Sequence, residues 1–266
     1  MPPTPVKDQE ILVPDLHSGQ KLVKAERKKR NFVCAHRGWR KSSLAIHLVV
    51  EHLLTGQNAG WYAPTFNVVT SSNWVDFKKV AGGDSTWFNK NESSWTIPGR
   101  GTCFFFSMDR PESARGGTFS LAIGEEMGEW SDGIFESIVE PIVQKADGEF
   151  WGIGTPNIIT PLNDFHRLVE LAASYPDTHN SYIIPAWGAD FDANGDLVEG
   201  LDPSYRYCCK ESPFRTFKEM AASWTRARNP DRWQIEYLCR FISSEGVQFS
   251  GVDEACILKP ILERAA

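Results

Sequence analysis

Apolar and polar positions along the chain predict short buried strands that alternate with helices. Four mostly apolar runs have the length of strands buried on both faces: residues 31–35, 60–63, 119–123 and 150–154. Residues 42–54 are almost entirely apolar over a length that indicates a buried helix, and residues 134–145 have the spacing of an amphipathic helix. This alternation predicts an α/β fold with a mostly parallel sheet flanked by helices.

Further segments extend this plan. Residues 18–29 are predicted to form a surface helix and residues 66–80 a crossover helix. Residues 95–107 predict two strands joined by a Pro-Gly-Arg-Gly turn. Residues 190–202 are rich in Asp, Asn and Gly, which is typical of a loop, and residues 203–241 indicate a smaller helical, basic unit.

The predicted loop has some features of a calcium site. Four oxygen-bearing side chains alternate around Gly195: Asp190, Asp192, Asn194 and Asp196. A calcium loop also needs a bidentate carboxylate at its end and flanking helices. The position of this segment between Pro185 and Pro203 favours a solvated connector instead.

Composition restricts the class of protein. The chain has 266 residues, of which 41% are hydrophobic, enough to bury a substantial core. No apolar run has the length of a bilayer span and the N-terminus lacks the apolar core of a signal peptide, so we expect a soluble protein of the cytosol. The six cysteines include no CxxC pair, which favours reduced, mostly buried thiols over a zinc site or a disulfide framework.

Charge is unevenly distributed. The formal net charge of −6 argues against a protein that coats nucleic acid over its whole surface, although a local basic face can still bind phosphates. Two groups of basic residues stand out: Lys21, Lys24, Arg27, Lys28, Lys29 and Arg30, and then Arg206, Lys210, Arg215, Lys218, Arg226, Arg228 and Arg232. A solvated helix face explains either group equally well.

Residues 35–42, Ala-His-Arg-Gly-Trp-Arg-Lys-Ser, lie between a predicted strand and a predicted helix. This is the context of a GxxxxGK[ST] phosphate loop, in which the Lys reaches the β- and γ-phosphates and the hydroxyl binds Mg²⁺. Lys41 and Ser42 match, whereas Ala35 and Arg40 occupy the glycine positions. A non-glycine residue at positive φ costs on the order of 1–2 kcal/mol. The nucleotide-binding candidates in this loop are His36, Gly38, Trp39, Arg40, Lys41 and Ser42.

Two carboxylates follow the predicted strand at 119–123. Glu125 and Glu126 should lie at the carboxyl edge of the sheet, where open α/β folds bind their ligands. A P-loop enzyme needs one carboxylate for the Mg²⁺ shell and often a second that orients and deprotonates water. Glu125 and Glu126 suit these roles in that order, although two acidic residues after a strand also fit a surface loop.

Three further residues fall in an order that suits the same chemistry. Gln20 could read an adenine edge with its amide, or be an ordinary polar residue at a helix N-terminus. Arg115, in a glycine-rich turn, could reach a phosphate on a neighbouring subunit, or be a solvated turn residue. Thr155 ends the next strand, where a hydroxyl could sense the nucleotide or simply close a turn.

Together these segments resemble the large terminase subunits of tailed phages. The matching segments, in order, are Leu-His-Ser-Gly-Gln at 16–20 (adenine segment), residues 35–42 (variant Walker A), Trp-Tyr-Ala-Pro-Thr at 61–65, Pro-Glu-Ser-Ala-Arg-Gly at 111–116, Glu-Glu-Met-Gly-Glu-Trp at 125–130 (Walker B), Gly-Thr-Pro at 154–156 (coupling motif), and residues 233–237 and 245–249 (segment before the nuclease). Two positions depart from the family pattern. Gly38 and Arg40 stand as if the loop glycine and arginine were exchanged, and Glu125 replaces the Walker B aspartate.

The resemblance implies a role for each residue. Lys41 and Ser42 would bind phosphate and Mg²⁺, Glu125 would hold the metal shell, Glu126 would be the catalytic base, Gln20 would contact adenine, Arg37 would sense the γ-phosphate, Arg115 would act in trans as an arginine finger, and Thr155 would couple hydrolysis to DNA movement. It also implies a P-loop NTPase core at residues 1–200, a small helical lid subdomain at 201–241, and a linker at 242–266 toward an absent nuclease domain. Asp253 and Glu254, near the end, are too few clustered carboxylates for a two-metal site, so nuclease activity is not expected.

The function expected from this resemblance is an ATP-hydrolysing, Mg²⁺-dependent motor that moves double-stranded DNA into a procapsid. Its expected partners are DNA, a portal protein, a small terminase subunit and further copies in a ring, with a monomer in isolation as the alternative. We expect it in the cytoplasm of a bacterial host, transiently docked on the procapsid and without membrane contact. Two alternatives stay open: a nucleotide-binding assembly module with weak or no turnover, and a helicase-like DNA translocase.

Overall fold

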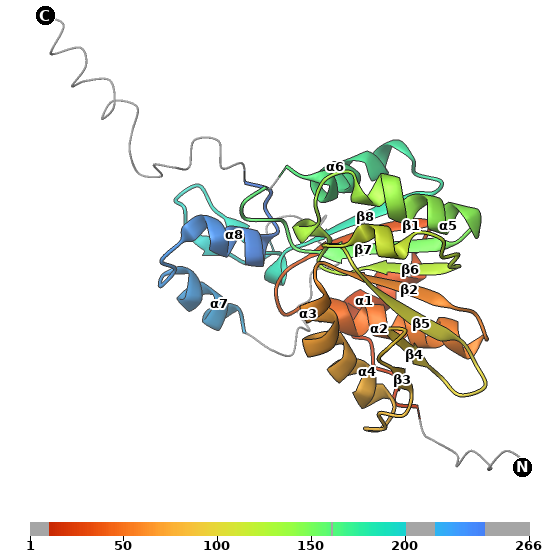
Figure 1. The fold of residues 1–266 in the computed structure, drawn as a ribbon. Helices are drawn as coiled ribbons and strands as arrows, with labels where there is room; N and C mark the ends of the chain where they lie inside the picture. The colour runs from red at the N-terminus through yellow and green to blue at the C-terminus, as the bar shows by residue number, and fades with distance from the viewer. Residues whose placement is uncertain (1–10, 161, 201–215, 243–266) are drawn as a thin grey trace, which may run out of the picture.

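The computed structural model describes residues 11–160, 162–200 and 216–242, and its centre is an eight-stranded sheet (Figure 1). In spatial order the strands are β3 (Phe88–Asn89), β4 (Ser94–Thr96), β5 (Thr102–Ser107), β2 (Ala59–Ala63), β6 (Leu121–Gly124), β7 (Glu149–Gly154), β1 (Arg30–Ala35) and β8 (His179–Ile184). The six strands from β5 to β8 in this order are parallel, and β3 and β4 add an antiparallel edge. The predicted mostly parallel sheet is confirmed.

Helices cover both faces of the sheet (Figure 1). One face carries α1 (Ser18–Ala25), α2 (Lys41–Leu54), α3 (Phe66–Val68), the π-helical turn η1 (Val69–Asn73) and α4 (Trp74–Val80). The other carries the π-helical turn η4 (Phe135–Val139), α5 (Glu140–Lys145) and α6 (Asp164–Leu171). Short 3₁₀ turns complete the connections: η2 (Pro111–Ala114), η3 (Met127–Glu129), η5 (Ala172–Ser174) and η6 (Ala186–Gly188). In the described part of the chain, no helix has the length and apolar character needed to cross a bilayer.

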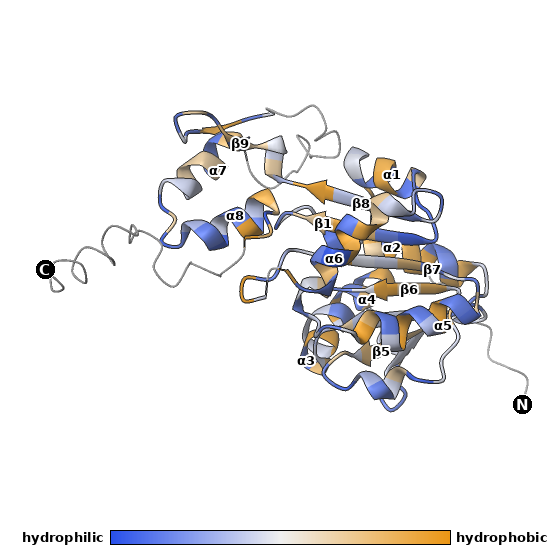
Figure 2. Ribbon diagram, turned by 90° about the horizontal axis from the view of Figure 1, so that it is seen from above, coloured by the Kyte–Doolittle hydropathy of each residue, from blue (hydrophilic) through white to orange (hydrophobic). Residues whose placement is uncertain are grey.

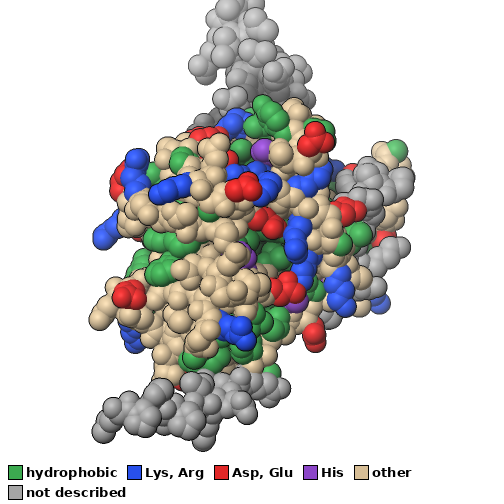
Figure 3. All heavy atoms as spheres, turned by 90° about the vertical axis from the view of Figure 1, so that its right-hand side faces the viewer, with side chains coloured by type: hydrophobic (Ala, Val, Ile, Leu, Met, Phe, Trp, Pro, Cys, Tyr) green, Lys and Arg blue, Asp and Glu red, His purple; other side chains and the backbone are tan. Residues whose placement is uncertain are grey.

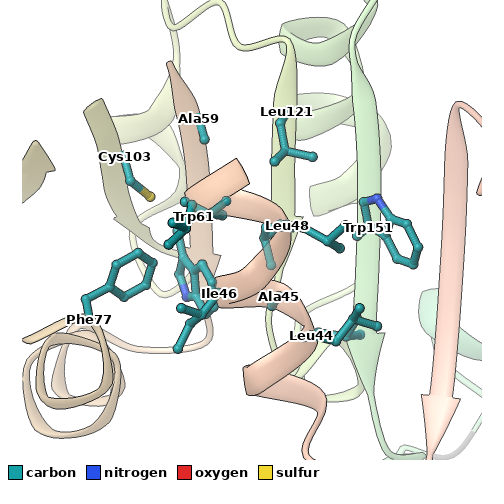
Figure 4. Close-up of a cluster of buried hydrophobic side chains, with 14 of the residues drawn as sticks. Leu44, Ala45, Ile46, Leu48, Ala59, Trp61, Phe77, Cys103, Leu121 and Trp151 are labelled. Atoms are coloured by element: carbon teal, nitrogen blue, oxygen red, sulfur yellow. The ribbon is translucent and has the colours of Figure 1, made fainter. Parts of the chain in front are cut away.

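The core forms two apolar layers because successive strand residues point to opposite faces. Trp61 and Trp151 face α2 and pack with its residues Leu44 and Leu48 (Figure 4). On the other face Phe150 packs against Phe135, with 4.7 Å between ring centroids. Every residue of β1 and β2 is buried, which explains the mostly apolar runs in the sequence.

A smaller unit lies beside the carboxyl ends of the strands, apart from the sheet (Figure 2). It consists of α7 (Phe217–Trp224), α8 (Pro230–Leu238) and a hairpin of β9 (Asp190–Phe191) and β10 (Leu197–Val198). The Phe191 and Trp224 rings are 4.9 Å apart, so the hairpin packs with α7. The helical part of the predicted unit is thus present at 217–238, whereas residues 201–215 and most of the predicted linker at 242–266 lie outside the described residues.

The prediction of a plain loop at 190–202 is wrong. Two short strands pair there, and the turn between them is closed by Asp192, whose Oδ1 accepts the amide N–H groups of Asn194 and Asp196 at 2.9 Å each. Asp192, Asn194 and Asp196 therefore form the turn of a hairpin, whereas Asp190 lies in its first strand.

The first basic segment is paired within the fold. Four of its residues form ion pairs: Lys24 with Glu51, Arg27 with Glu149, Lys29 with Asp147, and Arg30 with Glu140. The face seen in Figure 3 accordingly shows Lys and Arg side chains interspersed with Asp and Glu. Of the second group, Arg206, Lys210 and Arg215 lie outside the described residues, and Lys218, Arg226 and Arg228 are exposed on the α7–α8 unit.

Candidate nucleotide-binding site

The parallel sheet brings three predicted segments to one edge. The loop at 36–40 follows β1, Glu125 and Glu126 follow β6, and Thr155 follows β7. These three strands are neighbours in the order β6, β7, β1, so their carboxyl ends lie side by side. Residues far apart in the sequence thereby form one candidate site.

The loop between β1 and α2 has the left-handed conformations of a phosphate loop at two positions. Gly38 has φ +100°, and Arg40, the residue before α2, has φ +61°. Arg40 therefore carries the positive φ for which most loops of this kind use glycine, at a cost of about 1–2 kcal/mol. The Lys41 ammonium donates to the Ala35 carbonyl oxygen at 3.0 Å, which folds the lysine back over the loop.

Gln20 supports this loop from the side of α1. Its side chain is fully buried, and Nε2 donates to the carbonyl oxygens of Trp39 and Arg40 at 3.1 and 2.9 Å. Its Oε1 accepts the His17 amide N–H at 3.3 Å. Both polar atoms of the Gln20 amide are thus used inside the protein in this structure. Contact with adenine stays a prediction that requires these bonds to be exchanged.

His36 and Trp39 point into the protein. Both are buried, and the Trp39 ring lies 5.3 Å from the His17 ring. His36 Nδ1 donates to the Arg37 carbonyl oxygen at 2.9 Å, which leaves Nε2 buried without a partner. Burial, together with the charge of Lys41, lowers the pKa of His36 to about 4. These two buried side chains therefore anchor the loop to the interior of the protein.

Acid should destabilise the fold through His36. Between pH 6.5 and about 4 the unfolded chain binds a proton at His36 and the folded chain does not, so stability is lost as pH falls through this window. The full shift corresponds to about 3 kcal/mol. Urea unfolding at pH 7 and pH 4.5 should show a smaller difference for His36→Gln than for the wild type. An equal loss of stability in both proteins would exclude His36 as the cause.

Glu125 lies at the centre of the site and is only 5% exposed. Its Oε1 accepts the Ser42 hydroxyl at 3.1 Å, and its Oε2 accepts Trp61 Nε1 at 3.2 Å and Asn73 Nδ2 at 2.6 Å. Burial, with a further contribution from the Glu126 charge, raises the pKa of Glu125. The two residues predicted to hold the metal are therefore in direct contact. A hydroxyl and a carboxylate are oxygen ligands of the kind that Mg²⁺ prefers, so the donor set fits this ion.

Glu126 has a different environment from its neighbour. It has φ +43° and precedes η3, whose Glu129 amide N–H donates to the Glu126 carbonyl oxygen at 2.8 Å. Its side chain is partly exposed, whereas that of Glu125 is buried. One carboxylate is thus enclosed by donors and the next is partly accessible to solvent, which is compatible with the separate roles predicted for them.

Arg37 connects the loop to the smaller unit. Its amide N–H donates to the Glu236 carbonyl oxygen at 2.8 Å, and its guanidinium lies 3.2 Å from the Glu236 carboxylate. Arg232 holds the other oxygen of this carboxylate at 2.9 Å. The phosphate loop is therefore tied to α8 through both backbone and side chain.

Thr155 and Arg115 occupy separate surroundings. Thr155 lines a hollow of about 360 Å³ together with residues 156–159, Glu129 and three residues of α8, which are Arg232, Ile235 and Glu236. Arg115 is largely exposed and pairs with Glu112 of its own turn. Thr155 therefore lies next to α8, whereas Arg115 is paired within its own turn, and phosphate contact across a subunit boundary stays a prediction for it.

Sequence reasoning missed two residues of this site. Trp61 and Asn73 both donate to Glu125, but they lie 64 and 52 residues away from it in the chain. Trp61 belongs to a segment that was matched only as a strand, and Asn73 belongs to no motif, so neither was assigned a role at the site. One pattern in the sequence could have identified Asn73. It is a polar residue that shares a predicted helix face with the apolar residues Val69 and Phe77, where a buried polar side chain is unusual.

Comparison with known proteins shows the fold. No protein-family model matches the sequence, and no curated protein matches it. The ATPase domain of the large terminase of Thermus phage P74-26 is similar over 86% of this chain and 94% of that chain, with TM-score 0.56 and 16% identity. The HK97 bacteriophage large terminase is similar over 91% of this chain, with TM-score 0.63 and 14% identity. The large terminase of a thermophilic bacteriophage in complex with ADP is similar over 85% of this chain, with TM-score 0.56 and 10% identity.

The chain spans about half the length of two of these structures, covering 56% of the HK97 chain and 53% of the chain solved with ADP. At these identities the likeness concerns the arrangement of helices and strands. The chain therefore has the fold of the ATPase domain of phage large terminases.

Proposed function

We propose that this chain is the ATP-hydrolysing motor domain of a viral large terminase that moves double-stranded DNA into a procapsid. The observation that supports it most directly is the contact between Ser42 of the phosphate loop and Glu125 after β6, with Glu126 next to it. This contact joins the two halves of a nucleotide site on a fold shared with terminase ATPase domains, one of them solved with ADP.

The residues divide the reaction between them. Lys41 would leave the Ala35 carbonyl and bind the β- and γ-phosphates, with the loop amides around them. Ser42 and Glu125 would hold Mg²⁺, which neutralises charge on the phosphates. Glu126 would accept the proton of the attacking water, and Arg115 of a neighbouring copy would stabilise the charge that develops on the γ-phosphate. This need for a second copy implies a ring of subunits, with a monomer as the resting alternative.

Coupling to movement would run through Glu236. Arg37 is paired with the carboxylate of Glu236 in this structure. A bound γ-phosphate would be a stronger partner for its guanidinium, because it carries more negative charge and more acceptor oxygens. Transfer of Arg37 to the phosphate would release α8 from the loop. Thr155 lines the hollow next to the same helix and would respond to this release.

The proposed partners follow from the terminase function. They are duplex DNA held by its backbone without sequence readout, a portal protein, and a small terminase subunit. The proposed location is the cytoplasm of a bacterial host, with transient docking on the procapsid.

A second candidate function is a nucleotide-binding assembly module with weak or no turnover. The left-handed Arg40 supports it, because a strained loop can bind a nucleotide without the geometry needed for hydrolysis. Nucleotide binding without turnover in the assembled protein would favour the module. Separation of short duplexes would favour a helicase-like translocase, whereas movement along unmelted duplex supports the motor of a terminase.

Replacement of Lys41 by alanine tests the site itself. The loss of charge-assisted hydrogen bonds should weaken ATP and ADP binding by about 10- to 100-fold, measured by calorimetry or with a fluorescent analogue. Lys21→Ala is the matched control, because Lys21 is an exposed lysine of α1. Equal affinity of the Lys41→Ala variant and the wild type would place the nucleotide elsewhere and reject the proposed function.

A further inference from the structure

Asn73 is a buried amide on the core-facing side of a helical segment. Val69, Asn73, Phe77 and Val80 follow one another at helical spacing, and all four are buried. The other three belong to the apolar cluster around Trp61. An amide in such a position costs free energy unless its polar atoms are hydrogen bonded, so its contacts show why an asparagine is present.

Only half of this amide has a partner. Nδ2 donates to Glu125 Oε2 at 2.6 Å in a buried contact. An ionised carboxylate only accepts hydrogen bonds, so the NH₂ group is the side of the amide that faces Glu125. The amide oxygen Oδ1 is buried and has no hydrogen-bond partner among the described residues. A buried acceptor without a partner costs free energy, and a donor that arrives with a ligand would remove this cost.

The backbone around Asn73 is irregular. Asn73 is the last residue of the π-helical turn η1, which separates α3 from α4. Such turns contain one extra residue and occur frequently at functional sites. Asn73 therefore lies where an irregular turn passes into a regular helix, and its side chain contacts Glu125 from there.

We propose that Asn73 is a positioning residue for the metal-binding carboxylate of this site. Its NH₂ group, together with Trp61 Nε1, fixes Glu125 Oε2 and thereby directs Oε1 toward Ser42. Its amide oxygen accepts a hydrogen bond from a water molecule of the bound Mg²⁺. Glutamate has one more rotatable bond than the aspartate usual at this position, so it needs more restraint. This inference rests on the proposed function, because it concerns the metal that accompanies the nucleotide.

The chemistry of Mg²⁺ supports this assignment. The ion keeps several water molecules when it binds to one or two protein ligands, and those waters are hydrogen-bond donors. Outer residues that orient metal ligands typically account for about 10- to 100-fold in metal affinity. We therefore expect the loss of Asn73 to weaken Mg²⁺ binding strongly. It should have little effect on the contacts that the nucleotide makes without the metal.

The experiment compares metal-dependent and metal-free nucleotide binding in the full chain. Asn73→Leu removes the amide at similar volume, Asn73→Ala removes the side chain, and Ser72→Ala is the matched control on the exposed side of the same turn. Binding of a fluorescent ADP analogue is titrated with Mg²⁺ and repeated in EDTA. For both Asn73 variants the Mg²⁺ concentration at half-maximal effect should rise by about 10- to 100-fold. Affinity in EDTA should match the wild type, as should all values for Ser72→Ala. The thermal transition shows that each variant is folded at the temperature of the titration, although loss of the buried side chain is expected to lower it.

Three results would overturn the inference. An unchanged Mg²⁺ midpoint in both variants would show that Asn73 does not act on the metal. A joint fall of the Mg²⁺ response, the EDTA affinity and the thermal transition, or failure of both variants to fold, would show a merely structural role. A wild type that binds no nucleotide under either condition would reject the proposed function, and the inference with it. That last result differs from the others because it appears in the unmodified chain.

Discussion

Replacement of Glu126 by glutamine is expected to lower ATP turnover by about 100- to 10,000-fold, because it removes the general base and retains the size of the side chain. Binding of ATP should persist, since Lys41, Ser42 and Glu125 are unchanged. The measurement is steady-state phosphate release with Mg²⁺ at high protein concentration, with and without duplex DNA.

Glu129→Gln is the matched control for this prediction. Glu129 is an exposed carboxylate three residues further along, and the Glu126 charge, after burial, contributes to raising the pKa of Glu129. A similar loss in both variants would point to a general electrostatic effect of this acidic segment. Full turnover in the Glu126→Gln variant would remove Glu126 from the role of base. No turnover in the wild type, with ATP still bound, would favour the assembly module.

Replacement of Arg115 by alanine should lower turnover by about 1,000-fold or more in the assembled protein, which is the scale observed for arginine fingers. Nucleotide binding by the isolated chain should be unaffected, because Arg115 pairs with Glu112 of its own turn in this structure. Arg110→Ala, an exposed arginine a few residues earlier, is the control.

A mixing experiment tests whether Arg115 acts in trans. The Glu126→Gln and Arg115→Ala variants should each be inactive, but an interface that combines Arg115 of the first with Glu126 of the second is complete. Mixed subunits should therefore recover part of the wild-type rate. If mixtures stay as inactive as the separate variants while the subunits still associate, Arg115 does not contribute to a neighbour's site.

Much of the fold could be predicted from hydrophobic pattern because the central strands are buried on both faces. Residues 32–35 and 60–63 contain no polar side chain except the Tyr62 hydroxyl for this reason, and they lie in β1 and β2. β8 was missed because it is an edge strand whose residues His179, Asn180 and Ser181 are only partly buried and therefore polar. Helix α6 was missed as well, although its Asn163 cap and the apolar positions at 165, 168 and 169 are a recognisable signal.

The candidate site was predictable where spacing within one segment fixes geometry. Lys41 and Ser42 lie at the start of a helix after a strand, and Glu125 and Glu126 directly follow another strand. Contacts between segments could not be predicted in the same way. The contacts of Glu125 with Trp61 and Asn73, and of Arg37 with Glu236, depend on the order of the strands and on the path of the chain between them. Neither feature leaves a local pattern in the sequence.

The position of β1 between β7 and β8 also governs how the protein can fold during synthesis. The phosphate loop belongs to the first 42 residues, but β1 pairs with β7 and β8, which begin at Glu149 and His179. The partner of Arg37 in α8 lies 199 residues further along the chain. At about 5–20 residues per second, the ribosome delivers this partner roughly 10–40 s after the loop has been made. The loop therefore lacks its contact with α8 during most of translation. Parallel strand pairing over such sequence distances is also typical of slow folding.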